Sequence, residues 1–117
     1  MSLKIKYPMG EASVRTIDAP TAAGQTVTID NNLDVIKLTG LTANTTINFE
    51  VATNLEAGAR VILDVVQGAT GRNVTLGTLA KAPVLTGVNL DRDVIELVYD
   101  GTEFIAVAAW VKIVDAA

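Results

Sequence analysis

The sequence predicts an all-β fold, in the form of an antiparallel β-sandwich, a jelly-roll-like domain or a small barrel. Half of the residues are hydrophobic but only 4% are aromatic, and Thr is abundant beside Val, Ile, Leu and Ala. Val, Ile and Thr favour pleated strands because branching at Cβ restricts the first side-chain torsion. Short strand-like segments recur about every eight to twelve residues, and no segment keeps a helical spacing long enough for a helix.

The chain of 117 residues is long enough for one domain with its own core. Residues 1–24 differ from the remainder because Pro and Gly interrupt them and their apolar residues follow no period. We expect this segment to be an N-terminal arm or a loosely attached first strand, with a floppy terminus as the alternative. Residues 25–117 are expected to form a single β-sandwich domain.

From residue 25 onward, alternating apolar and polar residues predict successive strands. Val27 and Ile29 alternate with threonines, and Ile47, Phe49 and Val51 alternate with polar residues, which is typical of half-buried strands. Gly, Asn, Asp and Pro mark the turns between these segments. The expected strands cover residues 26–29, 35–38, 46–51, 61–65, 74–76, 83–85, 94–99 and 104–114.

The strongest local signal is the dipeptide Asp100-Gly101 between two apolar segments. It favours a β-hairpin with a two-residue type I′ turn, in which both central residues have positive φ. Because the strand period is two, one set of side chains from both strands then shares a core face. The expected cross-strand pairs are Tyr99 with Thr102, Leu97 with Phe104, and Ile95 with Ala106.

The opposite face of this hairpin is also largely apolar, whereas a face in contact with water is usually polar. It carries Val94, Glu96, Val98, Glu103, Ile105 and Val107. Either a second sheet or the N-terminal segment covers this face, or a neighbouring copy of the chain does. The small size and high apolar fraction favour the neighbouring copy, so we predict a subunit interface. Its predicted residues are Val94, Val98, Ile105, Val107 and Trp110, although Trp110 is also compatible with an ordinary core position.

The residue types that most catalytic chemistry requires are missing. The chain has no His and no Cys, which excludes imidazole bases, thiol nucleophiles and disulfides. Glu50 with Asp64, on neighbouring predicted strands, or Asp91 with Asp93 offers a carboxylate pair for glycoside hydrolysis. The scarcity of aromatic residues that would stack on sugar rings argues against this activity. We therefore expect neither an enzyme nor a cofactor.

Asp30, Asn32 and Asp34 repeat the alternating oxygen ligands of a calcium-binding loop. However, Val35 stands where such a loop needs Gly, and Leu41 stands where it needs a bidentate Glu. We expect a polar turn between two strands and predict no metal site.

The charge pattern argues against a nucleic-acid partner. The net charge is −4 and the nine basic residues are scattered singly along the chain, without interleaved aromatic residues. The longest uncharged apolar segment, residues 104–111, is far too short to span a bilayer and is expected to be a strand buried on both faces.

Residues from about Gln25 to Ala109 resemble a module found in bacteriophage virion proteins, particularly tail and head fibres. The resemblance rests on the order and spacing of four stretches. They are Leu-Thr-Gly-Leu-Thr-Ala-Asn-Thr-Thr-Ile at 38–47, Gly-Ala-Thr-Gly-Arg-Asn-Val-Thr at 68–75, Ala-Pro-Val-Leu-Thr at 82–86 and Val-Tyr-Asp-Gly-Thr-Glu-Phe at 98–104. Members of this family often carry Trp after the second stretch and an aromatic pair after Asp-Gly-Thr, and this chain has neither.

The resemblance implies a sandwich-like domain that forms a homotrimer and serves virion structure or attachment to a host surface. It implies a non-enzymatic fibre, tail or capsid-decoration component that binds copies of itself, in the virion or, before assembly, in the bacterial cytoplasm. Residues 1–24 would then contact other virion proteins. The alternative is a carbohydrate-binding module of β-sandwich type. That function would need an exposed platform built from Tyr7, Phe49, Tyr99, Phe104 and Trp110.

Overall fold

The structure, a computed structural model, describes residues 12–114, and this range folds into ten strands without a helix. The prediction of an all-β fold is thereby confirmed for these residues. The strands are β1 (Ala12–Asp18), β2 (Gln25–Ile29), β3 (Leu33–Thr39), β4 (Thr45–Val51), β5 (Arg60–Val66), β6 (Val74–Leu76), β7 (Ala80–Lys81), β8 (Arg92–Tyr99), β9 (Phe104–Ala106) and β10 (Val111–Lys112).

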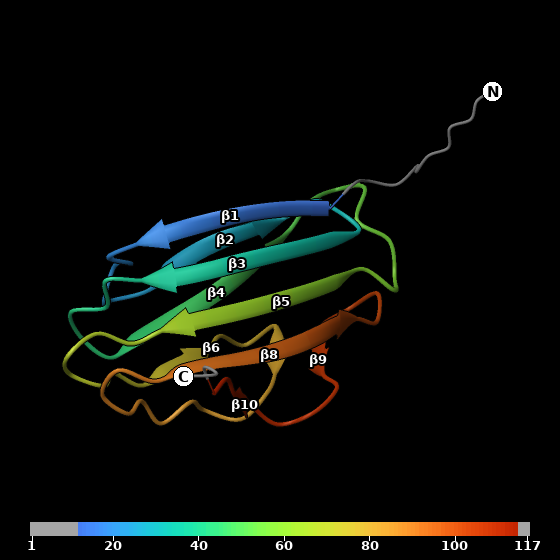
Figure 1. Cartoon of the computed structure of the whole chain (residues 1–117). Coiled ribbons are helices and arrows are strands. Elements are labelled where there is room, and N and C mark those ends of the chain that lie inside the picture. The colour runs from blue at the N-terminus through green and yellow to red at the C-terminus, as the bar shows by residue number, and fades with distance from the viewer. Residues whose placement is uncertain (1–11, 115–117) are drawn as a thin grey trace.

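The strands form two sheets that face each other (Figure 1). Sheet A has the order β1-β3-β5-β8-β9-β7, with β10 also paired to β8, and sheet B has the order β2-β4-β6. The first six strands alternate between the two sheets, and each is parallel to its predecessor in the same sheet. The chain therefore follows the course of a β-helix over this region. Each coil consists of one strand of sheet A and one of sheet B, and successive coils stack on one another.

The predicted antiparallel pairing is wrong for these six strands. Sheet B is entirely parallel, and sheet A is mixed, because β8 runs antiparallel to both β5 and β9. The same turn residues can reverse the chain within one sheet or carry it across to a facing sheet. Gly40, for example, adopts a positive φ of 63° after β3, and the chain there crosses to β4 in the other sheet.

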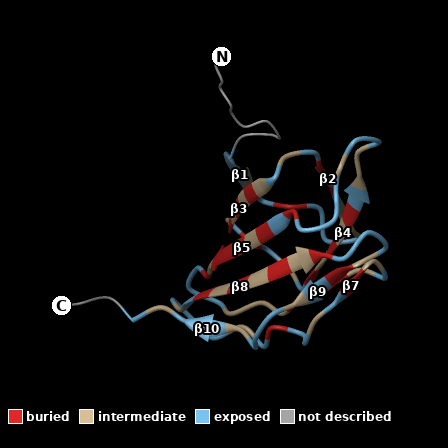
Figure 2. Ribbon diagram, turned by 90° about the vertical axis from the view of Figure 1, so that its right-hand side faces the viewer, coloured by how far each residue is buried: buried red, intermediate tan, exposed pale blue. Residues whose placement is uncertain are grey.

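The core lies between the two sheets and is built by alternate residues of each strand. Fully buried side chains come from both layers, among them Ile36 and Leu63 of sheet A and Ile29 and Ile47 of sheet B. The ring of Phe104 lies 5.0 Å from that of Phe49, across the two sheets, and 4.9 Å from that of Tyr99. Figure 2 shows the buried bands alternating with exposed ones along the strands.

The predicted hairpin is present, but its turn and register differ. Tyr99 pairs with Phe104 and Leu97 with Ala106, so that four residues, 100–103, form the loop. Asp100 does not take the positive φ of a type I′ turn, since its Oδ1 accepts hydrogen bonds from the backbone N–H groups of Thr102 and Glu103. These hydrogen bonds lower the pKa of Asp100. The register shift is two residues, so each side chain keeps its predicted face.

The last expected strand divides into two short ones. Between β9 and β10 the chain leaves the sheet, and Val107, Ala108 and Ala109 are exposed. The prediction of a strand buried on both faces is therefore wrong for residues 104–111. An apolar run of this length does not indicate where a chain bends.

The N-terminal segment enters sheet A within the described residues. Strand β1 pairs with β3 over its whole length, from Ala12 opposite Leu33 to Asp18 opposite Thr39. The remainder of the predicted arm, residues 1–11, lies outside the described residues. In the expected strand at 83–85, only an isolated bridge between Val74 and Leu85 forms.

Candidate self-association surface

The outer face of sheet A, which points away from sheet B, carries apolar side chains from several neighbouring strands. Register places Val14, Val35 and Ile62 in one row across β1, β3 and β5. A second row runs from Leu33 through Arg60 to Val98 and Ile105. The apolar members of this face are Ala12, Val14, Leu33, Val35, Ile62, Val66, Val94, Val98, Ile105 and Val111.

Among the described residues, no strand lies over this face (Figure 2). Its central members are half-buried because neighbouring side chains in the sheet flank them on both sides. Members near its rim are open to solvent, with Val14 76%, Val111 56% and Ile105 37% exposed. Isolated exposed Val residues are ordinary, but a contiguous apolar face over several strands is characteristic of an interaction surface.

Two ion pairs lie on the outer face. Arg92 Nε and Nη2 donate to the two carboxylate oxygens of Asp64 at 2.9 and 2.7 Å. Arg60 Nη1 lies 3.1 Å from Glu96 Oε2. Asp64 is almost fully buried although no strand within residues 12–114 covers the face, because the planar guanidinium of Arg92 lies against it.

The outer face of sheet B has the opposite character. Every outward-pointing position on its strands is polar, and the set consists of Thr26, Thr28, Thr46, Asn48, Glu50 and Thr75. Thr28 Oγ1 donates a hydrogen bond of 2.9 Å to Glu50 Oε1 on the neighbouring strand. This is the composition expected of a sheet that meets water on one side.

The structure places four of the five predicted interface residues on or beside the outer face of sheet A. Val94 and Val98 point outward from β8, and Ile105 lies opposite Val98 on β9. Val107 follows β9, donates its N–H to the carbonyl of Glu96, and is 57% exposed. Trp110 lies elsewhere, packed against the core with its Nε1 donating to the carbonyl of Pro83.

Sequence reasoning missed the part of this surface that lies on β1, β3 and β5. The side chains concerned are Val14, Leu33, Val35, Ile62 and Val66. Their positions became neighbours only through parallel pairing between segments about twenty or more residues apart, which the antiparallel prediction did not include. A partial signal was present in β5, where Ile62 and Val66 lie on the second face beside the charged Arg60 and Asp64.

Of the two candidate carboxylate pairs, Glu50 and Asp64 do not come together, whereas Asp91 and Asp93 lie near each other but in structural contacts. Glu50 points outward from sheet B and Asp64 points outward from sheet A, so the two lie on opposite sides of the molecule. Asp93 is buried, and its pKa is raised by burial and by the nearby carboxylate of Asp91, against a smaller opposing effect of Lys112. Asp91 itself forms an ion pair of 3.1 Å with Lys112.

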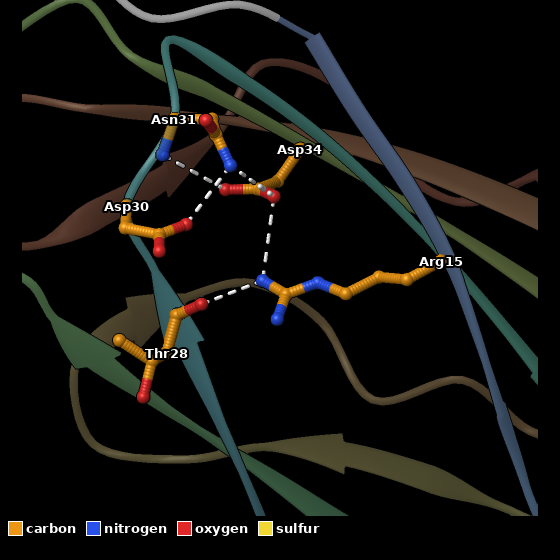
Figure 3. A network of polar contacts seen from close by, with 5 residues as sticks. All are labelled: Arg15, Thr28, Asp30, Asn31 and Asp34. Carbon is orange, nitrogen blue, oxygen red and sulfur yellow. Dashed lines mark hydrogen bonds and ion pairs between the residues drawn. The ribbon is translucent and has the colours of Figure 1, made fainter.

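The calcium-like residues also serve structural contacts. Asp34 is fully buried and accepts hydrogen bonds from Asn31 and from the guanidinium of Arg15, while Asp30 accepts one from the Asn31 side chain (Figure 3). In the range 12–114, no group of three or more potential metal ligands of the His, Cys, Asp and Glu types is found.

The rings of Phe49, Tyr99 and Phe104 are buried in the core and offer no flat platform to a sugar. Of the remaining aromatic residues, Trp110 is half-buried, and Tyr7 lies outside the described residues. The geometry thus supplies no observation in favour of a carbohydrate-binding module.

No protein-family model matches the chain, and no curated protein matches its sequence. No helix with the length and hydropathy of a membrane span occurs in residues 12–114.

Proposed function

We propose that this protein is a non-enzymatic assembly module that binds further copies of itself through the outer face of sheet A. In this proposal it serves as a structural component of a bacteriophage or prophage virion, such as a fibre, tail or capsid-decoration protein. The observation that carries the proposal is the contrast between the two outer faces. About half of the outward positions of sheet A are apolar, whereas every outward position of sheet B is polar.

The charge balance of the outer face of sheet A favours a second copy of the chain as the binding partner. On the outer face of sheet A, Lys37, Arg60 and Arg92 are balanced by Asp18, Asp64 and Glu96. Lys81 of β7, opposite Ile105, forms an ion pair with Glu103, so the face is neutral. The net charge of −4 therefore resides elsewhere on the chain. Two such faces can approach without the electrostatic repulsion that two acidic surfaces would suffer, and no basic partner is required.

The size of the face suits a stable interface. Its five columns of strands, β1, β3, β5, β8 and the shared β9 and β10 column, span about 24 Å, and seven residues along a strand span about 23 Å. The projected area is therefore about 550 Å². Because side chains make the accessible area larger than its projection, this approaches the roughly 800 Å² per partner of an ordinary protein interface.

The resemblance to virion proteins supports the biological setting and a homotrimer as the expected state. The facing sheets with one shared core support a sandwich-like unit as the repeating element of such an assembly. In this setting residues 1–11, which precede β1, would contact other virion proteins.

Size-exclusion chromatography with light scattering tests the proposal. The protein is expected to form a defined oligomer at micromolar concentration, and Val98→Glu is expected to reduce it to a folded monomer. In the monomer the new carboxylate would lie beside Arg60, its register neighbour, whereas in an interface it would be buried. The matched control is Thr46→Glu on sheet B, which should leave the oligomer intact. A wild-type monomer throughout the concentration range would contradict the proposal.

A further inference from the structure

One end of the stacked coils is formed by the two outermost described strands, β1 of sheet A and β2 of sheet B. A strand at the edge of a sheet presents unpaired N–H and C=O groups that can bind a strand of another chain. In β2, the carbonyl of Ile29 points toward β4, since it accepts the N–H of Ala52 beyond that strand. Carbonyl directions alternate along a strand, so the carbonyl of Thr28 points toward the open edge.

Arg15 occupies this open edge (Figure 3). Its side chain points inward from β1, reaches across the end of the core, and donates from Nη2 to the carbonyl oxygen of Thr28. The same Nη2 lies 3.3 Å from Asp34 Oδ1. The guanidinium therefore stands where the backbone N–H of an added strand would have to bind.

Asp34 holds the guanidinium in this position. It is fully buried at the start of β3, and its Oδ2 accepts a hydrogen bond of 3.3 Å from the backbone N–H of Asn31. Arg15 Nε is buried and finds no hydrogen-bond partner among the described residues. Asp34 is fully buried in this ion pair, whereas the Arg15 side chain is 36% exposed. A partly buried ion pair with an unsatisfied donor is a poor way to gain stability, which favours a role in specificity.

We propose that Arg15, positioned by Asp34, closes the end of the coil stack and prevents a second copy from adding strands to β2. An inward-pointing charge is one of the means by which edge strands avoid pairing with other chains. Copies of the chain then cannot extend sheet B into an open-ended stack. This inference does not depend on self-association through sheet A.

The test uses the full chain carrying Val98→Glu, so that contact through the outer face of sheet A is disabled in every sample. Into this background we would place Arg15→Met with Asp34→Asn, which removes both charges while preserving side-chain length. The matched control is Lys112→Met with Asp91→Asn, an ion pair of 3.1 Å between β10 and the residue before β8, away from both the β2 edge and the outer face of sheet A. Circular dichroism checks the fold, and light scattering with small-angle scattering measures mass and maximum dimension.

The Arg15 and Asp34 variant is expected to form elongated species at protein concentrations at least about tenfold below those at which the control associates. Adding Thr28→Pro should abolish them, because proline at this edge removes a donor that β4 does not use. Equal masses for the folded variant and the control, or association that Thr28→Pro leaves unchanged, would overturn the proposal.

Arg15→Gln serves as the second variant if the pair substitution prevents folding. Glutamine removes the positive charge from the edge, while its side-chain amide can still donate a hydrogen bond to Asp34. It should therefore give the same elongated species, and a folded Arg15→Gln monomer would equally refute the inference. Failure of the sheet A proposal would appear separately, as a wild-type monomer.

Discussion

The two outer faces of this molecule differ in composition although they are built from similar strands of one chain. Sheet B presents mostly threonines outward, whereas sheet A presents valines and isoleucines interspersed with charged residues. Thr and Val have nearly the same shape and both favour strands, because both are branched at Cβ. Strand formation therefore does not explain the difference. In our proposal, the choice between a hydroxyl and a methyl group reflects what each face contacts, which is water for sheet B and a second copy of the chain for sheet A.

Substitutions that make the outer face of sheet A resemble that of sheet B test this comparison most directly, and they should have the largest effect. Combining Val35→Thr, Val66→Thr and Val94→Thr keeps strand propensity but buries three hydroxyl groups in the proposed interface. Each should cost about 1–3 kcal/mol of association free energy, so the affinity between copies should fall by at least about 100-fold. Analytical ultracentrifugation over a dilution series measures this change. An unchanged dissociation constant would show that the valines do not contact a second copy.

The next largest effect, on the free energy of unfolding, is expected from the ion pair between Asp64 and Arg92 on sheet A. Asp64→Ala removes both hydrogen bonds from Arg92 and should lower the free energy of unfolding by about 1–2 kcal/mol, with allowance for the solvent exposure of Arg92. Glu50→Ala on sheet B removes one hydrogen bond from Thr28 and should change stability by less than about 0.5 kcal/mol. Urea unfolding of both variants gives the two values. Equal losses of unfolding free energy would mean that the carboxylates of the two faces stabilise the protein to the same extent.

The converse change makes sheet B resemble sheet A. Thr26→Val, Thr28→Val and Thr46→Val together should create a second apolar face and lower the concentration at which higher oligomers appear by about tenfold. Light scattering detects these species, and the single variant Thr75→Val, at the far edge of the sheet, should produce none. If the triple variant keeps the wild-type mass, an apolar outer face alone is insufficient for association.

The alternation of side chains was predictable from the sequence, whereas the pairing of strands was not. Ile47 and Phe49 were expected inside and are inside, because a period of two fixes the face from local residues alone. The partner of a strand depends on where the preceding turn sends the chain. Val14, Val35 and Ile62 are separated by more than twenty residues in sequence at each step, and only parallel coils bring them into one row.

The candidate surface was predicted at β8 and β9 because these strands are joined by a short loop. Local geometry there is sufficient to relate Val98 to Ile105, even though the expected turn was wrong by two residues. Trp110 was assigned to the surface on residue type, and its hydrogen bond to Pro83 instead holds it beside the core. Arg15 gave no local signal, since its contacts with Thr28 and Asp34 come from two other strands.

The smallest effect concerns a charge on the inner side of sheet A, where neither outer face is involved. Burial and the carboxylate of Asp91 raise the pKa of Asp93 above its ordinary value of 3.8. In the pH interval between the unfolded and folded pKa values, the folded chain binds more protons at Asp93 than the unfolded chain does. Stability contributed by this group is therefore present at low pH and is lost as the pH rises through the folded pKa. Asp93→Asn should make the protein slightly more stable at neutral pH. It should also reduce the decrease in unfolding free energy that accompanies the rise in pH.

Urea unfolding at several pH values, with Glu50→Gln as the exposed control, isolates the contribution of Asp93. Asp100 has the opposite linkage, since its lowered pKa contributes stability above the unfolded pKa that is lost as the pH falls. Because Asp100 is unchanged in both variants, its effect cancels when each is compared with the wild type. If Asp93→Asn and Glu50→Gln give the same pH profile, the inner carboxylate is as well solvated as one on sheet B. The contrast between the faces would then rest on their aliphatic side chains alone.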